Sequence, residues 1–137
     1  MKNYSAEMII ALGNYIAEGK PYYYNIITEK KCPELLLVRE AIEGHDSAFD
    51  HLMKNKQFVL AAFVSAIWND DKALSFLIKQ KVPQWAATAA AVVGTGEALL
   101  WLRKHNLEPF AILAEKIKHK LKSQKRSDLE FLFKGPY

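Results

Sequence analysis

A 25-residue repeat is the feature of this sequence that most restricts its fold. Four consecutive blocks of equal length cover residues 20–44, 45–69, 70–94 and 95–119, and stacking them aligns apolar residues in columns. Four of these columns are Tyr24/Phe49/Leu74/Leu99, Ile27/Leu52/Leu77/Leu102, Leu35/Leu60/Trp85/Phe110 and Ile42/Ile67/Val92/Ile117. A period of this length is typical of repeat proteins, in which each unit buries its apolar face against its neighbours.

The residues that stop and start helices repeat at the same period. The stop column contains residues that favour a left-handed backbone at a helix end, and it consists of Gly19, Gly44, Asn69 and Gly94. The residues just after these stops have side chains that accept hydrogen bonds from a helix N-terminus. These candidate caps are Asp46 or Ser47, Asp70 or Asp71, and Thr95.

Proline marks the start of a second helix in the blocks. Pro33 and Pro83 share a column and Pro109 falls one place later, which suits the first turn of a helix because its N–H groups need no intrahelical partner. Each block therefore predicts a short helix of about nine residues, a tight turn and a longer helix of about twelve. Helix-rich packing with an accidental period is the alternative interpretation.

The segments beside the repeats are expected to cap the stack. Residues 1–19 predict an N-terminal cap helix and residues 120–137 a C-terminal cap. Within the latter, Ser127 and Glu130 have capping-box spacing, which predicts a last short helix. The alanine-rich stretch 86–91 indicates that the third long helix is central and closely approached. A chain of 137 residues suits a single domain. We therefore expect an all-α, right-handed α-solenoid-like stack of about four 25-residue helical hairpins with terminal capping helices.

Two stretches resemble a known repeat family. Gly94-Thr95-Gly96-Glu97-Ala98-Leu99-Leu100-Trp101-Leu102 resembles the ankyrin-repeat pattern, and Val82-Pro83-Gln84-Trp85-Ala86-Ala87 is similar to its opening. Ankyrin units have about 33 residues, so these blocks lack about the length of the hairpin loop. Short HEAT-like helical hairpins fit equally well. The resemblance implies a degenerate α-solenoid without hairpin loops, and repeats of this kind generally serve as binding surfaces.

The net charge of +4 is produced locally. One acid-free segment contains six basic residues: Lys116, Lys118, Lys120, Lys122, Lys125 and Arg126. The rest of the chain has 13 basic residues against 15 acidic ones, so it is slightly acidic. On a helix, these lysines would flank an apolar seam of Leu113, Ile117 and Leu121, an arrangement typical of a helix with solvated flanks.

Lysine also recurs within the repeat. Lys54, Lys79 and Lys104 share one column, and Lys31, Lys56 and Lys81 share another nearby. At the ends of the short helices they would complement the negative end of the helix dipole. They would also form an electrostatic strip for an acidic partner. With Trp101, whose column has mixed polarity, the candidate partner-binding residues are Lys54, Lys56, Lys79, Lys81, Trp101 and Lys104.

The sequence offers no recognisable catalytic or metal-binding constellation. His45 and His51 are six positions apart, which places them on different faces of a helix, and no His-Glu-x-x-His or Cys-x-x-Cys motif occurs. Asp70-Asp71 is explained by capping, and Cys32 has no histidine near it in sequence to activate a thiol. We therefore expect no enzymatic activity, no metal and no cofactor.

The function expected from these features is non-enzymatic protein–protein interaction, with an acidic partner if the lysines are used. The alternative is nonspecific DNA or RNA binding through the lysine columns and the basic helix 116–126. It is disfavoured because the chain has only three arginines. A single cysteine suits a reducing compartment, the cytoplasm, and the longest apolar run, Phe58 to Trp68, is too short to span a bilayer.

Overall fold

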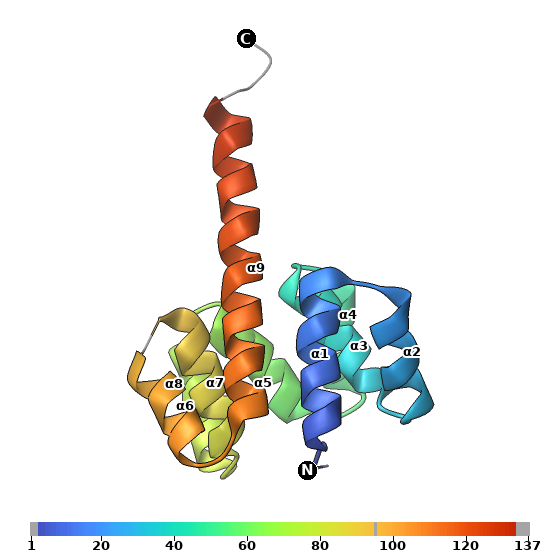
Figure 1. Cartoon of the computed structure of the whole chain (residues 1–137), viewed down its shortest axis with the longest axis vertical. Helices are drawn as coiled ribbons and strands as arrows, with labels where there is room; N and C mark the ends of the chain where they lie inside the picture. The colour runs from blue at the N-terminus through green and yellow to red at the C-terminus, as the bar shows by residue number, and fades with distance from the viewer. Residues whose placement is uncertain (1–2, 95, 134–137) are drawn as a thin grey trace.

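The computed structural model describes residues 3–94 and 96–133, and the side chains of residues 124–133 lie outside the description. Over these residues the chain is all-helical, as predicted, and forms nine helices (Figure 1). They are α1 (Ala6–Glu18), α2 (Pro21–Glu29), α3 (Pro33–Ile42), α4 (Asp46–Lys54), α5 (Phe58–Ile67), α6 (Asp71–Lys79), α7 (Pro83–Val93), α8 (Gly96–Lys104) and α9 (Glu108–Phe133).

The helix bounds follow the period of the sequence. Helices α2, α4, α6 and α8 begin 25 residues apart, and each has 9 residues. Helices α3, α5 and α7 have 10, 10 and 11 residues, slightly fewer than expected. Pro33 and Pro83 begin their helices, and the stops Gly19, Gly44, Asn69 and Gly94 all have a positive φ. The predicted alternation of short and longer helices is therefore present.

The turn after each short helix has the same geometry in every block. One residue per turn has a φ between 57° and 60°, and these residues are Lys31, Lys56, Lys81 and Asn106. The next backbone N–H donates to a carbonyl five residues back, that of Ile27, Leu52, Leu77 or Leu102. These four side chains have 0% exposure. This combination of a left-handed residue and a 6→1 hydrogen bond is the Schellman motif. The left-handed lysines were not predicted.

The predicted N-caps are partly right. Asp70 Oδ1 accepts hydrogen bonds from the backbone N–H of Lys72 at 3.0 Å and of Ala73 at 3.3 Å, which confirms it as a cap. The cap predicted at Asp46 or Ser47 is wrong, because α4 already begins at Asp46 and its N-cap is His45. Thr95 lies outside the described residues.

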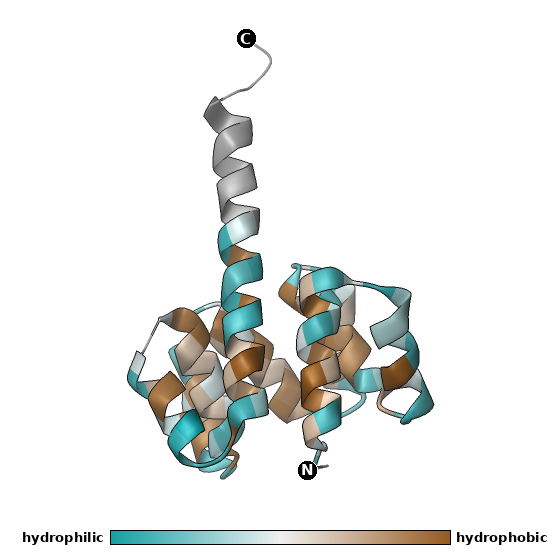
Figure 2. Cartoon of the chain, viewed as in Figure 1, coloured by the Kyte–Doolittle hydropathy of each residue, from teal (hydrophilic) through white to brown (hydrophobic). Residues whose placement is uncertain are grey.

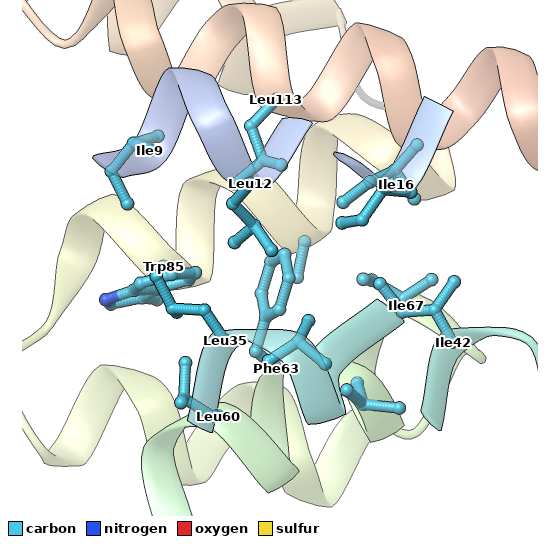
Figure 3. Close-up of a cluster of buried hydrophobic side chains, with 14 of the residues drawn as sticks. Ile9, Leu12, Ile16, Leu35, Ile42, Leu60, Phe63, Ile67, Trp85 and Leu113 are labelled. Atoms are coloured by element: carbon cyan, nitrogen blue, oxygen red, sulfur yellow. The ribbon is translucent and has the colours of Figure 1, made fainter. Parts of the chain in front are cut away.

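The longer helices surround the hydrophobic core. Helices α1, α3, α5, α7 and α9 contact one another in that order, and α1 also packs extensively along α9. Each short helix lies against the two longer helices that precede and follow it. Figure 3 shows side chains from all five longer helices meeting inside, among them Leu12, Leu35, Phe63, Trp85 and Leu113. The interior side of these helices is therefore filled by the core.

Two expectations about the longer helices have different outcomes. Helix α7, which contains the alanine stretch, contacts α5, α6, α8 and α9, so its central position is confirmed. The separate short helix expected after Ser127 is wrong, because α9 runs unbroken from Glu108 to Phe133. The stop column holds His119 within α9, where the earlier blocks have glycine or asparagine.

The coloured part of α9, next to the other helices, alternates hydrophobic and hydrophilic residues (Figure 2). Leu113 and Ile117 of the predicted apolar seam are fully buried, and Leu121 is partly buried. None of the helices in the described ranges has both the length and the apolar character required to cross a membrane.

Candidate functional site

An apolar groove of about 290 Å³ lies on the outer layer of the molecule. Helices α4 and α6 form its walls and α5 forms its floor. We call it the α4–α6 groove, and it is lined by Phe49, Met53, Phe58, Ala61, Ala62, Ser65, Asp70, Lys72, Ala73 and Phe76. Met53 is 43% exposed and Phe58 45%, so the groove presents two large apolar side chains to solvent.

The sequence produces this groove through the repeat. Helices α4 and α6 both rest on α5, and the floor between them carries the small side chains of Ala61 and Ala62. Phe58 is the first residue of α5, in the column that holds Pro33 and Pro83 in neighbouring blocks. The first turn of a longer helix reaches the outer surface, so a phenylalanine placed there is left half exposed.

A second groove, of about 470 Å³, occupies the equivalent place one block earlier, between α2 and α4. Six of its lining residues precede lining residues of the α4–α6 groove by 25 positions: Tyr24, Pro33, Leu36, Leu37, Glu40 and His51. The earlier groove also includes the carboxylates of Glu34 and Glu40. The repeat therefore places a groove at successive seams, and the α4–α6 groove is the more apolar of the two.

The candidate lysines lie at one end of the short helices. Lys54, Lys79 and Lys104 are the last residues of α4, α6 and α8, and Lys56 and Lys81 occupy left-handed turns. All five side chains are exposed, and within the described part of the chain none makes an ion pair or a side-chain hydrogen bond. We call these five residues the lysine ridge. Since the core fills the interior side of the longer helices, the ridge belongs to the outer layer, although none of its five lysines lines the α4–α6 or the α2–α4 groove.

Trp101, the remaining candidate in this set, does not line the α4–α6 groove. It lies in α8, where its partly buried ring stacks on the imidazole of His105 at a centroid distance of 4.1 Å. The structure thus places it in the same outer layer as the ridge but against its own helix.

The lysines of the basic segment face different surroundings. Lys116, Lys118 and Lys120 are partly buried and Lys122 is exposed, while the side chains of Lys125 and Arg126 lie outside the described residues. Lys120 Nζ lies 3.4 Å from Glu43 Oε1, so this flank of α9 contacts the end of α3. The prediction of solvated flanks therefore holds for Lys122 but not for Lys120, which is partly buried and paired with Glu43.

The other candidates have structural surroundings. Cys32 is 4% exposed, belongs to the core, and its Sγ–H donates to the Lys30 carbonyl at 3.4 Å. His51 is exposed and lines the α2–α4 groove. Across residues 3–94 and 96–133, no group of three or more His, Cys, Asp or Glu side chains is placed to hold a metal ion.

Sequence reasoning missed the aromatic lining of the α4–α6 groove. Phe49 was assigned to a core column, although it is only partly buried, and the exposure of Met53 and Phe58 was not predicted. The usable signal was Phe58, a large apolar residue in a column that otherwise holds residues suited to an exposed helix start.

The fold and these grooves define an all-α protein whose helix bounds and outer grooves recur every 25 residues. The chain matches no protein-family model, no curated protein and no solved structure.

Proposed function

We propose that this chain is a helical-repeat binding module that holds a partner protein and catalyses no reaction. In this proposal the four hairpins form a degenerate ankyrin-like or HEAT-like solenoid whose two ends pack together. The period of the helix bounds supports the repeat, and the contact between α1 and α9 supports the meeting of the ends. The single buried cysteine is in keeping with a reducing compartment such as the cytoplasm.

The observation that carries the proposal is the α4–α6 groove with its exposed apolar lining. A groove between two helices, floored by small residues, suits an amphipathic helix that inserts apolar side chains at i and i+4. Lys72 lines the groove together with Asp70, whose carboxylate is engaged in capping α6, and Lys54 and Lys56 lie between Met53 and Phe58 in sequence. The partner segment is therefore expected to carry acidic residues beside its apolar anchors.

The left-handed lysines support a role for the ridge. Lys56 and Lys81 have φ values of 59° and 57°, a conformation that glycine or asparagine adopts at lower energetic cost. Asn106 at the equivalent turn shows that the repeat accommodates asparagine there. A locally unfavourable residue at equivalent turns suggests that its charge serves another purpose.

A peptide selection tests this function. Random peptides displayed on phage are selected against the full chain, and the affinity of the consensus peptide is measured by fluorescence polarisation. We expect a consensus with apolar residues at i and i+4 and acidic flanks. Met53→Ser should weaken its binding about 30-fold, the effect of losing an interface hot spot. Leu100→Ser removes a residue that is 66% exposed outside the groove and should leave binding unchanged.

Two outcomes would contradict the proposal. One is a consensus that binds Met53→Ser and the parent chain equally well. The other is nucleic-acid binding in place of peptide binding: retention of an oligonucleotide on a filter, falling steeply between two salt concentrations, with no peptide selected.

A further inference from the structure

A pocket of about 530 Å³ lies where α1, the α3–α4 turn and α9 meet. It uses no residue of the α4–α6 groove. Apart from Ala17 of α1, its lining is polar and consists of Glu43, His45, Lys116, His119, Lys120 and Ser123. These residues come from distant parts of the sequence, so the pocket exists only because α9 packs beside α1 and α3.

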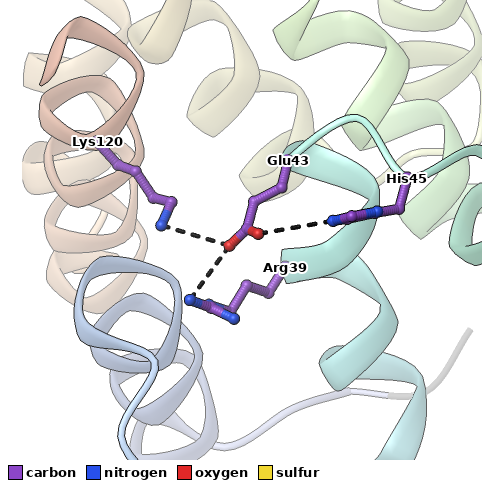
Figure 4. A network of polar contacts seen from close by, with 4 residues as sticks. All are labelled: Arg39, Glu43, His45 and Lys120. Atoms are coloured by element: carbon purple, nitrogen blue, oxygen red, sulfur yellow. Dashed lines mark ion pairs between the residues drawn. The ribbon is translucent and has the colours of Figure 1, made fainter. Parts of the chain in front are cut away.

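The carboxylate in this pocket is already neutralised. Glu43 Oε1 lies 3.2 Å from Arg39 Nη2 and 3.4 Å from Lys120 Nζ, and Oε2 lies 3.9 Å from His45 Nε2 (Figure 4). The side chains of Arg39, Glu43 and Lys120 are each about a quarter exposed, which strengthens these contacts relative to surface ion pairs.

Arg39 is fixed from the α1 side. Its guanidinium carbon lies 5.0 Å from the centroid of the Tyr15 ring, a cation–π contact. It also fills the space beside Gly19, where an added Cβ would come within 2.5 Å of Nη2. The pairing of Arg39 with Glu43 is thus preorganised by α1, and the negative charge of Glu43 is committed to the protein's own cations.

Lys116 adds a positive charge that the described residues do not balance. Its stem packs over Gly13 of α1, where an added Cβ would lie 3.4 Å from Lys116 Cδ. The side chain is partly buried, and it makes no ion pair or hydrogen bond within the described ranges. Arg39 does not line the pocket, but it pairs with Glu43 and cancels the charge of that carboxylate. The lining lysines Lys116 and Lys120 therefore leave two positive charges in excess even when both histidines are neutral.

We propose that this pocket binds the phosphate group of a small organic phosphate. A phosphate group carries close to two negative charges at neutral pH and accepts hydrogen bonds on three oxygens. It therefore matches both the charge excess and the donors of Lys116, Lys120 and the Ser123 hydroxyl, whereas a carboxylate would balance one charge only. The volume lies within the range of small-molecule sites.

The test uses the full chain and four probes: ribose 5-phosphate, inorganic phosphate, acetate and a short single-stranded oligonucleotide. Calorimetric titrations at about 0.15 M salt, where long-range charge attraction is screened, should give one saturable site for the two phosphates and weaker binding of acetate. Amide NMR shifts should localise binding to His45, Lys116 and Lys120. Lys116→Gln should weaken ribose 5-phosphate binding about tenfold, the loss expected for one charge-assisted hydrogen bond.

Lys122→Gln is the matched control, because Lys122 is an exposed lysine of the same helix that does not line the pocket. The affinity of the Lys122→Gln variant for ribose 5-phosphate should equal that of the parent chain. Equal weakening by both variants, or no saturable phosphate binding at millimolar concentration, would overturn the proposal. Binding of the oligonucleotide without binding of either small phosphate would also overturn it. If circular dichroism shows that Lys116→Gln is unfolded, Ser123→Ala, which removes a donor at an exposed residue of the pocket, replaces it with the same expected direction of change.

Discussion

At the scale of single residues, the lysines with a positive φ carry a charge at a position where their backbone conformation is unfavourable. Lys56 has a φ of 59°, is exposed, and its side chain makes no ion pair or hydrogen bond within the described part of the chain. Lys56→Gly removes the conflict between Cβ and the backbone and should raise the free energy of unfolding by about 0.5–1 kcal/mol. Urea denaturation followed by far-UV circular dichroism measures the change.

Lys54→Gly is the matched control for this prediction. Lys54 is also an exposed lysine, two positions earlier, but it is the last residue of α4 and has helical backbone. Glycine there should lower the free energy of unfolding by up to about 1 kcal/mol. If both variants destabilised the protein equally, the left-handed turn would carry no strain. The charge-based argument for the lysine ridge would then lose its support.

At the scale of helices, two adjacent aspartates at the start of α6 allow the stabilisation by capping hydrogen bonds to be measured separately from the stabilisation by charge. Asp70 accepts two backbone hydrogen bonds at the start of α6, whereas Asp71 is the first helical residue and interacts mainly with the helix dipole. Asp70→Ala should lower the free energy of unfolding by about 1 kcal/mol. Asp71→Ala should lower it by about 0.3 kcal/mol. Thermal melts of both variants measure the difference, and equal losses would show that charge rather than capping stabilises α6.

The helices themselves were largely predictable because their signals are local and repeated. Stops such as Gly44 and Asn69, proline at Pro33 and Pro83, and buried columns such as that of Leu52 each act within one block. The left-handed turns were not predictable, since lysine gives no sign of a positive φ.

The sites were less predictable than the helices, for a physical reason. The α4–α6 groove depends on how two short helices rest on α5, and the phosphate pocket depends on α9 packing beside α1. The period places a groove at the seam between α4 and α6 but does not show that its apolar lining is exposed, and it does not encode the packing of α9 beside α1. The one local sign of the unbroken course of α9 is His119, which stands where the earlier blocks have glycine or asparagine.

At the scale of the whole molecule, the contact between α1 and α9 changes how the protein should unfold. In an open stack of repeats, each unit contacts only its neighbours, and terminal units can detach first. Here the first and last helices cover each other, and Ile9, Leu12 and Ile16 of α1 have 0% exposure. Loss of α1 would expose Leu113 and Ile117 as well, so we expect one cooperative transition.

Leu12→Ala tests this cooperativity. Removal of a fully buried leucine should lower the free energy of unfolding by about 2–5 kcal/mol. Trp85 in α7 can be observed alone in a Trp68→Phe, Trp101→Phe background. There, Leu12→Ala should lower the unfolding midpoint by the same amount in Trp85 fluorescence and in far-UV circular dichroism, because two-state unfolding gives coincident transitions. Ile10→Ala, at a residue 40% exposed, should cost much less. A Trp85 transition that stays in place while the circular dichroism splits into two steps would mean that α1 detaches alone. The contact between α1 and α9 would then not join the ends into one folding unit.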